Sequence, residues 1–155
     1  MRSYERFGSG PVVVDDDRLK ALGVKPRRTM RFLLWSAEEQ GLLGSRAYVA
    51  AHYATRPVNT DPEEADYPAS LRKRKWPITP LPDHTKVSAY FNLDNGGGRI
   101  RGIYAQENVA AAPIFRAWLE PLRDLGAETV STNATGSTDH VSFEEVGIPA
   151  CQFIQ

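Results

Sequence analysis

The stretch RFLLWSAEEQGLLGS, residues 31–45, decides the predicted fold. Its apolar run, residues 32–35, ends abruptly at Ser36, and two adjacent carboxylates, Glu38 and Glu39, follow. A short apolar run bounded by a polar turn predicts a buried strand, here over residues 27–35, in a sheet covered on both faces. Ligands of open α/β sheets gather outside the carboxyl ends of the strands, so both glutamates stand where such a fold places its chemistry.

The same residues also fit a purely structural interpretation. Ser36 and Glu39 have the spacing of a capping box, which satisfies the free amides at the start of a helix. The local pattern alone favours capping, but capping gives Glu38 no role. The choice between the two interpretations therefore depends on the rest of the chain.

Composition indicates one ordinary globular domain. The 155 residues are 41% hydrophobic and 25% charged, which suits a chain with a real core. Lys plus Arg equals Asp plus Glu at 19 each, so the net charge of the chain gives no indication that it binds nucleic acid or an anionic membrane. No apolar run approaches the length of a membrane span, and residues 1–10 lack the apolar core of a signal peptide. The single cysteine, Cys151, lies in an apolar run and is interpreted as a buried, unreactive thiol.

Three further features precede the proline-rich part of the chain. Residues 1–17 have no period, and the three acids at 15–17 are interpreted as a solvated charge run. A helix is expected to end near Leu22, with Gly23 at its C′ position. A second helix is expected after Glu39, with His52 at its end as a surface residue. Its apolar face comprises Leu42, Leu43, Ala47, Tyr48 and Ala51.

Residues 56–86 are rich in proline, with six of the eleven prolines of the chain, and predict a long surface loop or insertion. The basic run at 72–75, beside Trp76, has two interpretations. The basic side chains could bind nucleic acid. Acids just upstream and the zero net charge favour a solvated or self-paired loop instead.

The second half alternates strands and helices. Residues 87–95 and 99–106 predict two strands, and the glycines at 96–98 between them predict a hairpin. A helix is expected over 109–125, then short strands at 128–132 and 148–154, with a helical turn at 142–146 between them. The core side of the helix is expected to comprise Ile114, Phe115, Trp118, Leu119 and Leu122. This order of elements predicts an α/β fold.

Three polar clusters terminate or follow these strands: Glu38 with Glu39, Asp94, and Asp139 with His140. Carboxylates and an imidazole suit zinc and similar divalent ions. Of two neighbouring glutamates, one can bind metal while the other takes a proton from the bound water. Taken singly, Asp94 fits a strand-end aspartate and His140 a hydrogen-bonded loop histidine. The joint pattern favours a metal site.

The stretches WSAEEQGLLGSRAY, FNLDN and GSTDHVSFEEVGIP resemble, in order, successive motifs of the co-catalytic dizinc aminopeptidases, which include carboxypeptidase Q-like enzymes. The resemblance covers residues 18–155 and implies a three-layer α/β sandwich around a mixed, mainly parallel sheet. It implies that Glu38 is the general base, Glu39 and His140 are ligands of one zinc ion, and Asp94 is a ligand of the other. It also implies a peptide or aminoacyl substrate, and a family whose members are often secreted or periplasmic.

One part of the family pattern is missing. The family places a His-x-Asp motif, and then a bridging aspartate, upstream of the helix that ends near Leu22. Residues 1–17 contain no histidine and are treated as a divergent segment, so residues 18–155 are expected to be a partial catalytic domain with its insertion at 56–86. A gene fragment explains this better than a genuine short homologue does, and we expect marginal stability and impaired activity.

Two functions from different classes follow. The first is a zinc exopeptidase that hydrolyses terminal peptide bonds with metal-activated water. The alternative is a non-catalytic, peptidase-like binding or scaffold domain, for which Glu38, Glu39, Asp94 and His140 would have no use. The working ion (zinc, cobalt or manganese), the preferred terminal residue and the oligomeric state leave no signature in the sequence.

Overall fold

The computed structural model describes residues 21, 23, 25–64, 67, 71–73, 76–94 and 96–155. Its α-helices are α2 (Leu43–His52), α3 (Ala112–Leu119) and α4 (His140–Glu144). Its strands are β1 (Ala54–Thr55), β2 (Thr79–Pro80), β3 (Tyr90–Asn92), β4 (Gly102–Tyr104), β5 (Thr129–Ser131) and β6 (Ala150–Ile154). Short 3-10 helices are η1 (Pro62–Glu64), η3 (His84–Lys86), η4 (Val109–Ala111) and η5 (Glu120–Leu125). The expectations for residues 1–17 lie outside the described residues.

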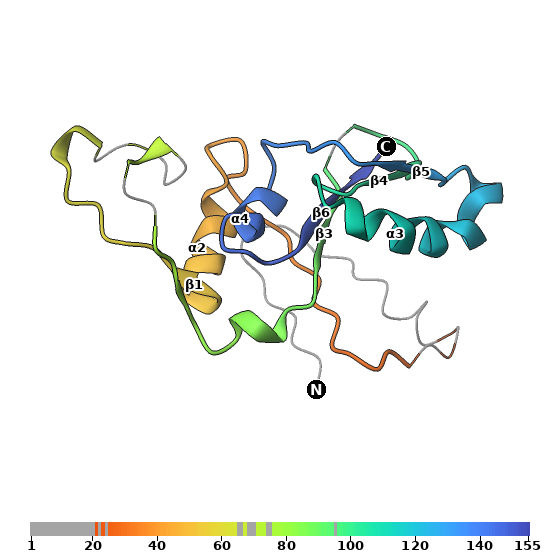
Figure 1. Cartoon of the computed structure of the whole chain (residues 1–155), viewed down its shortest axis with the longest axis horizontal. Coiled ribbons are helices and arrows are strands. Elements are labelled where there is room, and N and C mark those ends of the chain that lie inside the picture. Colours follow the sequence, from red (N-terminus) through yellow and green to blue (C-terminus); the bar gives the residue numbers. More distant parts are fainter. Residues whose placement is uncertain are drawn as a thin grey trace.

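A mixed four-stranded sheet of order β3-β6-β4-β5 lies beside α3 in the right-hand half of Figure 1. The β3 and β6 strands are parallel, as are β4 and β5, whereas β4 and β6 are antiparallel. The predicted α/β class with a mixed sheet is confirmed. The predicted hairpin between residues 87–95 and 99–106 is wrong, because β6 lies between β3 and β4. Strand β6, which is apolar, lies between these two strands and pairs with β3 along one edge and with β4 along the other.

The strand predicted over residues 27–35 is also wrong, because this segment is irregular. Leu33 and Trp35 pack against the core, but Phe32 and Leu34 are 44% and 50% exposed. Its bonds to the segment around β3 are made by side chains, for example from the Arg28 guanidinium to the Ser88 hydroxyl at 2.7 Å. Only one face of the segment is therefore covered, whereas the prediction required cover on both.

Helix α2 begins later than predicted, at Leu43, and its buried face is different. The side chains turned to the core are Leu42, Ser45, Tyr48 and Val49. Leu43 is 55% exposed, and Ala47 and Ala51 are exposed too. The expected position of His52 at the end of this helix is confirmed. Of the predicted face, only Leu42 and Tyr48 are buried, because the side of α2 that faces the core runs through Ser45, Tyr48 and Val49.

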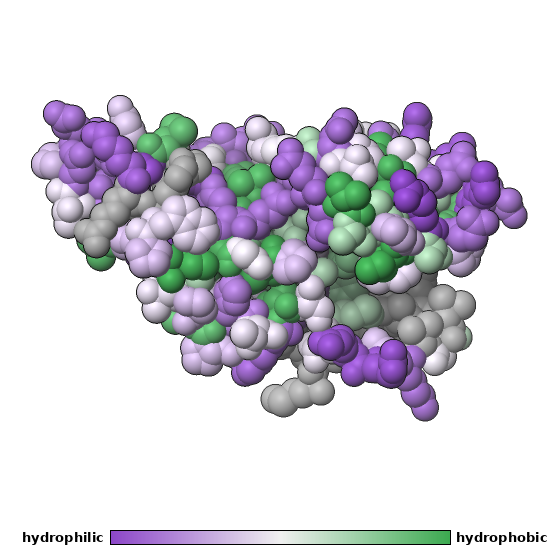
Figure 2. All heavy atoms as spheres, in the orientation of Figure 1, coloured by the Kyte–Doolittle hydropathy of each residue, from purple (hydrophilic) through white to green (hydrophobic). Residues whose placement is uncertain are grey.

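The helix predicted over 109–125 consists of three pieces, η4, α3 and η5. Pro121 lies at the start of η5, where the α-helix gives way to a 3-10 helix. Phe115 and Leu119 are buried as expected, but Ile114, Trp118 and Leu122 are exposed, because α3 presents one side to the sheet and the other outward. Figure 2 shows hydrophobic side chains at the surface in this region. The strands predicted at 128–132 and 148–154 are confirmed as β5 and β6, and the helical turn expected at 142–146 is found as α4.

Two hydrophobic clusters hold the structure together. One joins α2, β1 and α4 around Tyr48, Tyr53 and Phe143. The other lies between α3 and the sheet and contains Phe115 and Cys151. Cys151 is buried as expected, and desolvation raises the pKa of its thiol to about 11. Within the described residues, no helix is long and apolar enough to cross a lipid bilayer.

The described residues of the proline-rich segment 56–86 are mostly irregular, as predicted, and the regular elements among them include η1, η3 and the two residues of β2, which pair with β1. Part of it projects from the body of the molecule at the left of Figure 1. The Lys73 ammonium lies 3.6 Å from both Asp61 and Glu64, and Arg72 donates to the carbonyl oxygen of Tyr67. The self-paired interpretation is therefore confirmed for Arg72 and Lys73, whereas residues 74 and 75 lie outside the described residues.

Candidate functional site

Glu38 lies in a tight loop that leads into α2. The amides of Gly41 and Leu42 donate to the Glu38 carbonyl oxygen at 2.9 and 2.8 Å, which closes the loop on itself. Ala37 and Leu42 have positive φ angles of 55° and 60°. Left-handed conformations at non-glycine residues cost on the order of 1–3 kcal/mol each and occur often at functional sites. The backbone that presents Glu38 is therefore strained.

Gly44 fixes this loop against the first turn of α2. Its amide donates to the Ser36 carbonyl oxygen at 3.1 Å, and a Cβ atom at residue 44 would lie 2.6 Å from that same oxygen. The capping-box interpretation of Ser36 and Glu39 is wrong. The helix starts at Leu43, and its N-cap residue is Leu42, without a side-chain hydrogen bond.

Three acidic side chains from three segments lie within electrostatic reach of Glu38. Burial raises the pKa of Glu38, and the nearby charges of Asp94, Glu39 and Asp139 raise it further. Burial also raises the pKa of Asp139, and Asp94 adds to this, while a hydrogen bond from Ser45 and the nearby His140 act in the opposite direction. Concentrated negative charge of this kind favours either protonation or a bound cation.

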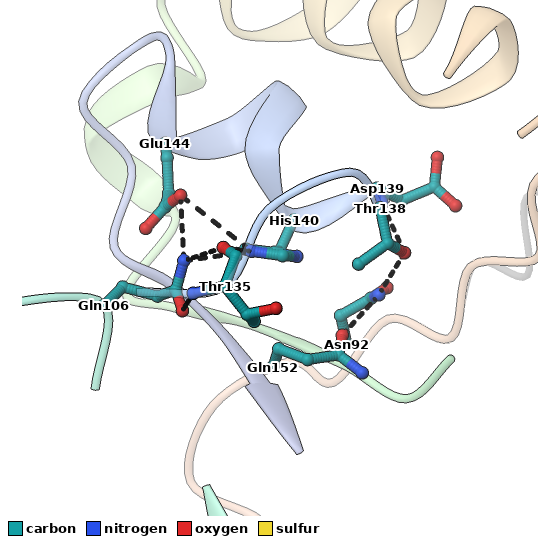
Figure 3. A network of polar contacts seen from close by, with 8 residues as sticks. All are labelled: Asn92, Gln106, Thr135, Thr138, Asp139, His140, Glu144 and Gln152. Atoms are coloured by element: carbon teal, nitrogen blue, oxygen red, sulfur yellow. Dashed lines mark hydrogen bonds and ion pairs between the residues drawn. The ribbon is translucent and has the colours of Figure 1, made fainter. Parts of the chain in front are cut away.

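Asp94 is tied to the loop before α4 by a hydrogen bond. The Thr138 hydroxyl donates to Asp94 Oδ2 at 2.5 Å. The same hydroxyl oxygen accepts from the side-chain nitrogen of Asn92, which also donates to Gln152 on β6 (Figure 3). The end of β3, the centre of the sheet and the loop that carries Asp139 are thus joined by polar side chains.

His140 is completely buried and belongs to a second polar group. Its Nε2 lies 3.0 Å from Gln106 Nε2, 3.0 Å from the Thr135 carbonyl oxygen and 4.0 Å from Glu144 Oε2. Its Nδ1 is buried and makes no hydrogen bond within the described part of the chain. Figure 3 shows the side chains of Asp139 and His140 extending in different directions. Glu38 and Asp94 are thus brought within electrostatic reach of Asp139, while the imidazole Nε2 contacts other partners.

The described residues fit a cation in charge but not in ligand number. No group of three or more His, Cys, Asp and Glu side chains among them is close enough to hold a metal ion. Catalytic zinc usually has three protein ligands. The acidic cluster around Glu38 nevertheless supplies oxygen donors and unbalanced negative charge, which a divalent cation would neutralise.

Several polar residues of this region were missed by sequence reasoning. Thr138 directly precedes the predicted pair Asp139 and His140, and Asn92 lies two residues before Asp94, on the same face of an extended chain. Both residues adjoin the predicted polar clusters, which is a signal visible in the sequence itself. Glu144 lies four residues after His140 in α4, a spacing that brings two helical side chains together and could have been seen in the sequence. Gln106 carried no such signal, because its contact with His140 depends on how the segment after β4 is placed against α4.

The fold and the site together define an α/β protein whose acidic side chains gather from the ends of separate segments. The chain belongs to Peptidase family M28, whose family model matches residues 16–155. It is 28% identical to leupeptin-inactivating enzyme 1 of Streptomyces exfoliatus and 26% identical to aminopeptidase YwaD of Bacillus subtilis (strain 168). These matches cover 92% and 95% of this chain, but only 26% and 27% of those proteins. Carboxypeptidase Q of Bos taurus is 53% identical over 36 residues, which are 23% of this chain and 8% of that protein. The chain thus spans about a quarter of the length of the two relatives that match most of it.

Proposed function

We propose that the protein is a zinc-dependent exopeptidase of the aminopeptidase type, which hydrolyses terminal peptide bonds of peptide or aminoacyl substrates. Membership of Peptidase family M28 supports a peptidase. The observation that carries the proposal is that Glu38 lies within electrostatic reach of Glu39, Asp94 and Asp139, which come from three separate segments of the sequence. In this proposal Glu38 is the general base, Glu39 and His140 hold one zinc ion, and Asp94 holds the other.

The role of Glu38 follows from its surroundings. A general base works best when its pKa lies near the working pH, and burial together with three neighbouring acids raises the pKa of Glu38 in that direction. The tight loop closed by Gly41 and Leu42 fixes the backbone from which its carboxylate takes a proton. Zinc, when bound, would polarise the scissile carbonyl group and activate the attacking water.

The proposal extends to the organisation of the domain. Residues 18–155 would form part of a catalytic domain with a three-layer arrangement and a proline-rich insertion at 56–86. Asp94 would be one ligand of one zinc ion, and Glu39 with His140 would be two ligands of the other. Since three protein ligands are usual, residues other than these must complete both sites.

A non-catalytic binding or scaffold domain is the second candidate. It is favoured by the failure of the described histidine, cysteine and acidic side chains to form a group of three around one point. The two candidates differ in whether zinc is retained and whether a substrate is turned over.

The test uses the purified 155-residue protein and a Glu38→Gln variant, with Glu63→Gln as control because Glu63 is an exposed glutamate in η1. Zinc content is measured by mass spectrometry after dialysis, and hydrolysis is measured with leucine para-nitroanilide. We expect zinc in all three proteins and a turnover lowered about 100-fold or more by Glu38→Gln alone, the usual loss of a general base. Bound zinc with unchanged turnover in Glu38→Gln would disprove the base assignment. Wild-type protein with neither zinc nor turnover would favour the scaffold.

A further inference from the structure

A continuous chain of hydrogen bonds runs from an indole to a carboxylate through the middle of the structure. Trp35 Nε1 donates to the Tyr90 hydroxyl oxygen at 2.9 Å, and that hydroxyl donates to Asn92 Oδ1 at 2.6 Å. Asn92 Nδ2 donates to Thr138 Oγ1 at 2.8 Å, and the Thr138 hydroxyl donates to Asp94 Oδ2 at 2.5 Å. Four side-chain hydrogen bonds thus connect Trp35 to Asp94.

The donor-to-acceptor direction of every hydrogen bond in this series is fixed by the groups at its two ends, Trp35 and Asp94. An indole nitrogen can only donate, and an ionised carboxylate can only accept. The Asn92 amide cannot be flipped, since its nitrogen also donates to Gln152 Oε1 at 2.7 Å while its oxygen accepts from Tyr90. All donors therefore point toward Asp94.

Thr138 is the residue on which this series of hydrogen bonds depends. Its oxygen accepts two hydrogen bonds, from Asn92 Nδ2 and from the Asp139 backbone amide at 2.7 Å, which use both of its lone pairs. Its single hydroxyl hydrogen is given to Asp94. Thr138 and Asn92 are both buried, and polar chains in a low-dielectric interior strengthen one another.

The series of hydrogen bonds from Trp35 to Asp94 also joins the three segments that carry the proposed site. Trp35 lies three residues before Glu38, Asn92 lies two residues before Asp94, and Thr138 directly precedes Asp139 and His140. We propose that Thr138 is a positioning residue, which holds the Asp94 carboxylate in a fixed place relative to the Trp35 and His140 segments through this one-way chain. The inference rests on the proposed function only in treating Asp94 as a zinc ligand.

The test compares Thr138→Val, which keeps the shape but removes the hydroxyl, with Thr138→Ser, which retains it. Thr132→Val makes the same change at an exposed threonine and is the control. The first readout is the indole N–H resonance of Trp35 in a ¹⁵N-correlated NMR spectrum, assigned with Trp35→Phe. The second is the dissociation constant for zinc, measured by calorimetry.

We expect Thr138→Val to shift the Trp35 indole resonance while those of Trp76 and Trp118 stay in place. We expect it to weaken zinc binding about tenfold, the usual cost of losing a partner of a metal ligand. Thr138→Ser should restore both properties, and Thr132→Val should change neither. If Thr138→Val proves to be unfolded by circular dichroism, Tyr90→Phe interrupts the same chain and should weaken zinc binding similarly.

Three results would overturn the inference: an unmoved Trp35 resonance in Thr138→Val, a zinc affinity unaffected by that variant, or a Thr138→Ser variant that behaves like Thr138→Val. Wild-type protein that binds no zinc would contradict the proposed function instead. The Trp35 resonance would then decide alone whether Thr138 holds the chain together.

Discussion

The rings of Tyr90 and Phe143 are stacked face to face, with their centroids 4.1 Å apart and their planes 5° from parallel. Tyr90 begins β3, the strand that leads to Asp94, and Phe143 lies in α4, the helix that begins at His140. Trp35 packs against Phe143 at 6.0 Å and donates its indole hydrogen to the Tyr90 hydroxyl. One aromatic contact therefore fixes the relative positions of the segments that carry the proposed site.

Replacing Phe143 with alanine should strongly destabilise the fold. Phe143 is 1% exposed, so the change removes a buried ring and leaves a cavity, which costs about 3–5 kcal/mol. Phe32→Ala is the matched control, because its partly exposed ring should cost far less. Urea unfolding followed by circular dichroism measures both. Equal losses of unfolding free energy in the two variants would show that the Tyr90–Phe143 contact does not organise the core.

Replacing Gly44 with alanine should disturb the loop that carries Glu38. The added Cβ atom would meet the Ser36 backbone oxygen at 2.6 Å, and a backbone atom cannot move aside without displacing the loop. Gly136→Ala is the control, since a Cβ atom there would meet nothing within 4 Å. We expect a lower melting temperature for Gly44→Ala only. If both variants melt alike, the close approach of α2 to Ser36 is wrong.

Glu38→Gln should stabilise the metal-free protein, and more so at higher pH. Burial and nearby acids raise the pKa of Glu38 above its usual value of 4.5, so the folded state binds the Glu38 proton more tightly than the unfolded chain does. The cost of ionising Glu38 is therefore absent at low pH and grows as the pH rises through its folded-state pKa. Thermal melting with a chelator, at about pH 4 and about pH 8, should show the larger gain at the higher pH. The Glu63→Gln control should show no such dependence, and a gain confined to the lower pH would reverse the sign of the argument.

Cys151 should resist alkylation while the protein is folded. Its thiol is buried and its pKa is raised to about 11 by desolvation, so the reactive thiolate is scarce at neutral pH. Mass spectrometry after treatment with iodoacetamide should show little modification in buffer and complete modification in guanidinium chloride. Equal rates under both conditions would place Cys151 at the surface.

Local patterns predicted the elements better than their arrangement. The run at 148–154 and the polar loop before it were enough to predict β6 and the turn that becomes α4. Pairing partners depend on contacts between distant segments, so the glycines at 96–98 could not reveal that β6 separates β3 from β4. The 31–35 run has the hydrophobicity of a buried strand, but that pattern says nothing about whether neighbouring elements cover its second face.

In the candidate site, too, local features could be predicted from the sequence, whereas contacts between distant segments could not. Sequence alone drew attention to Glu38, Glu39 and Asp94, because carboxylates after apolar runs are local features, and the structure places these acids within electrostatic reach. The contact of His140 with Gln106 joins residues 34 apart in the sequence and could not be foreseen, whereas Thr135 lies in the same loop, five residues before His140. The role of Thr138 depends on a hydroxyl reaching Asp94 across 44 residues of sequence, which only the folded chain reveals.

The most direct test of the proposed site is the melting temperature of the metal-stripped protein with and without added zinc. Zinc that binds the folded state at about a hundredfold excess over Kd adds about 2.7 kcal/mol, or roughly 5–10 °C for a domain of this size. We predict this rise for wild type and for Glu63→Gln, and its loss in the double variant Glu39→Gln/Asp94→Asn. A melting temperature that zinc leaves unchanged in wild type, or raises equally in the double variant, would contradict the site.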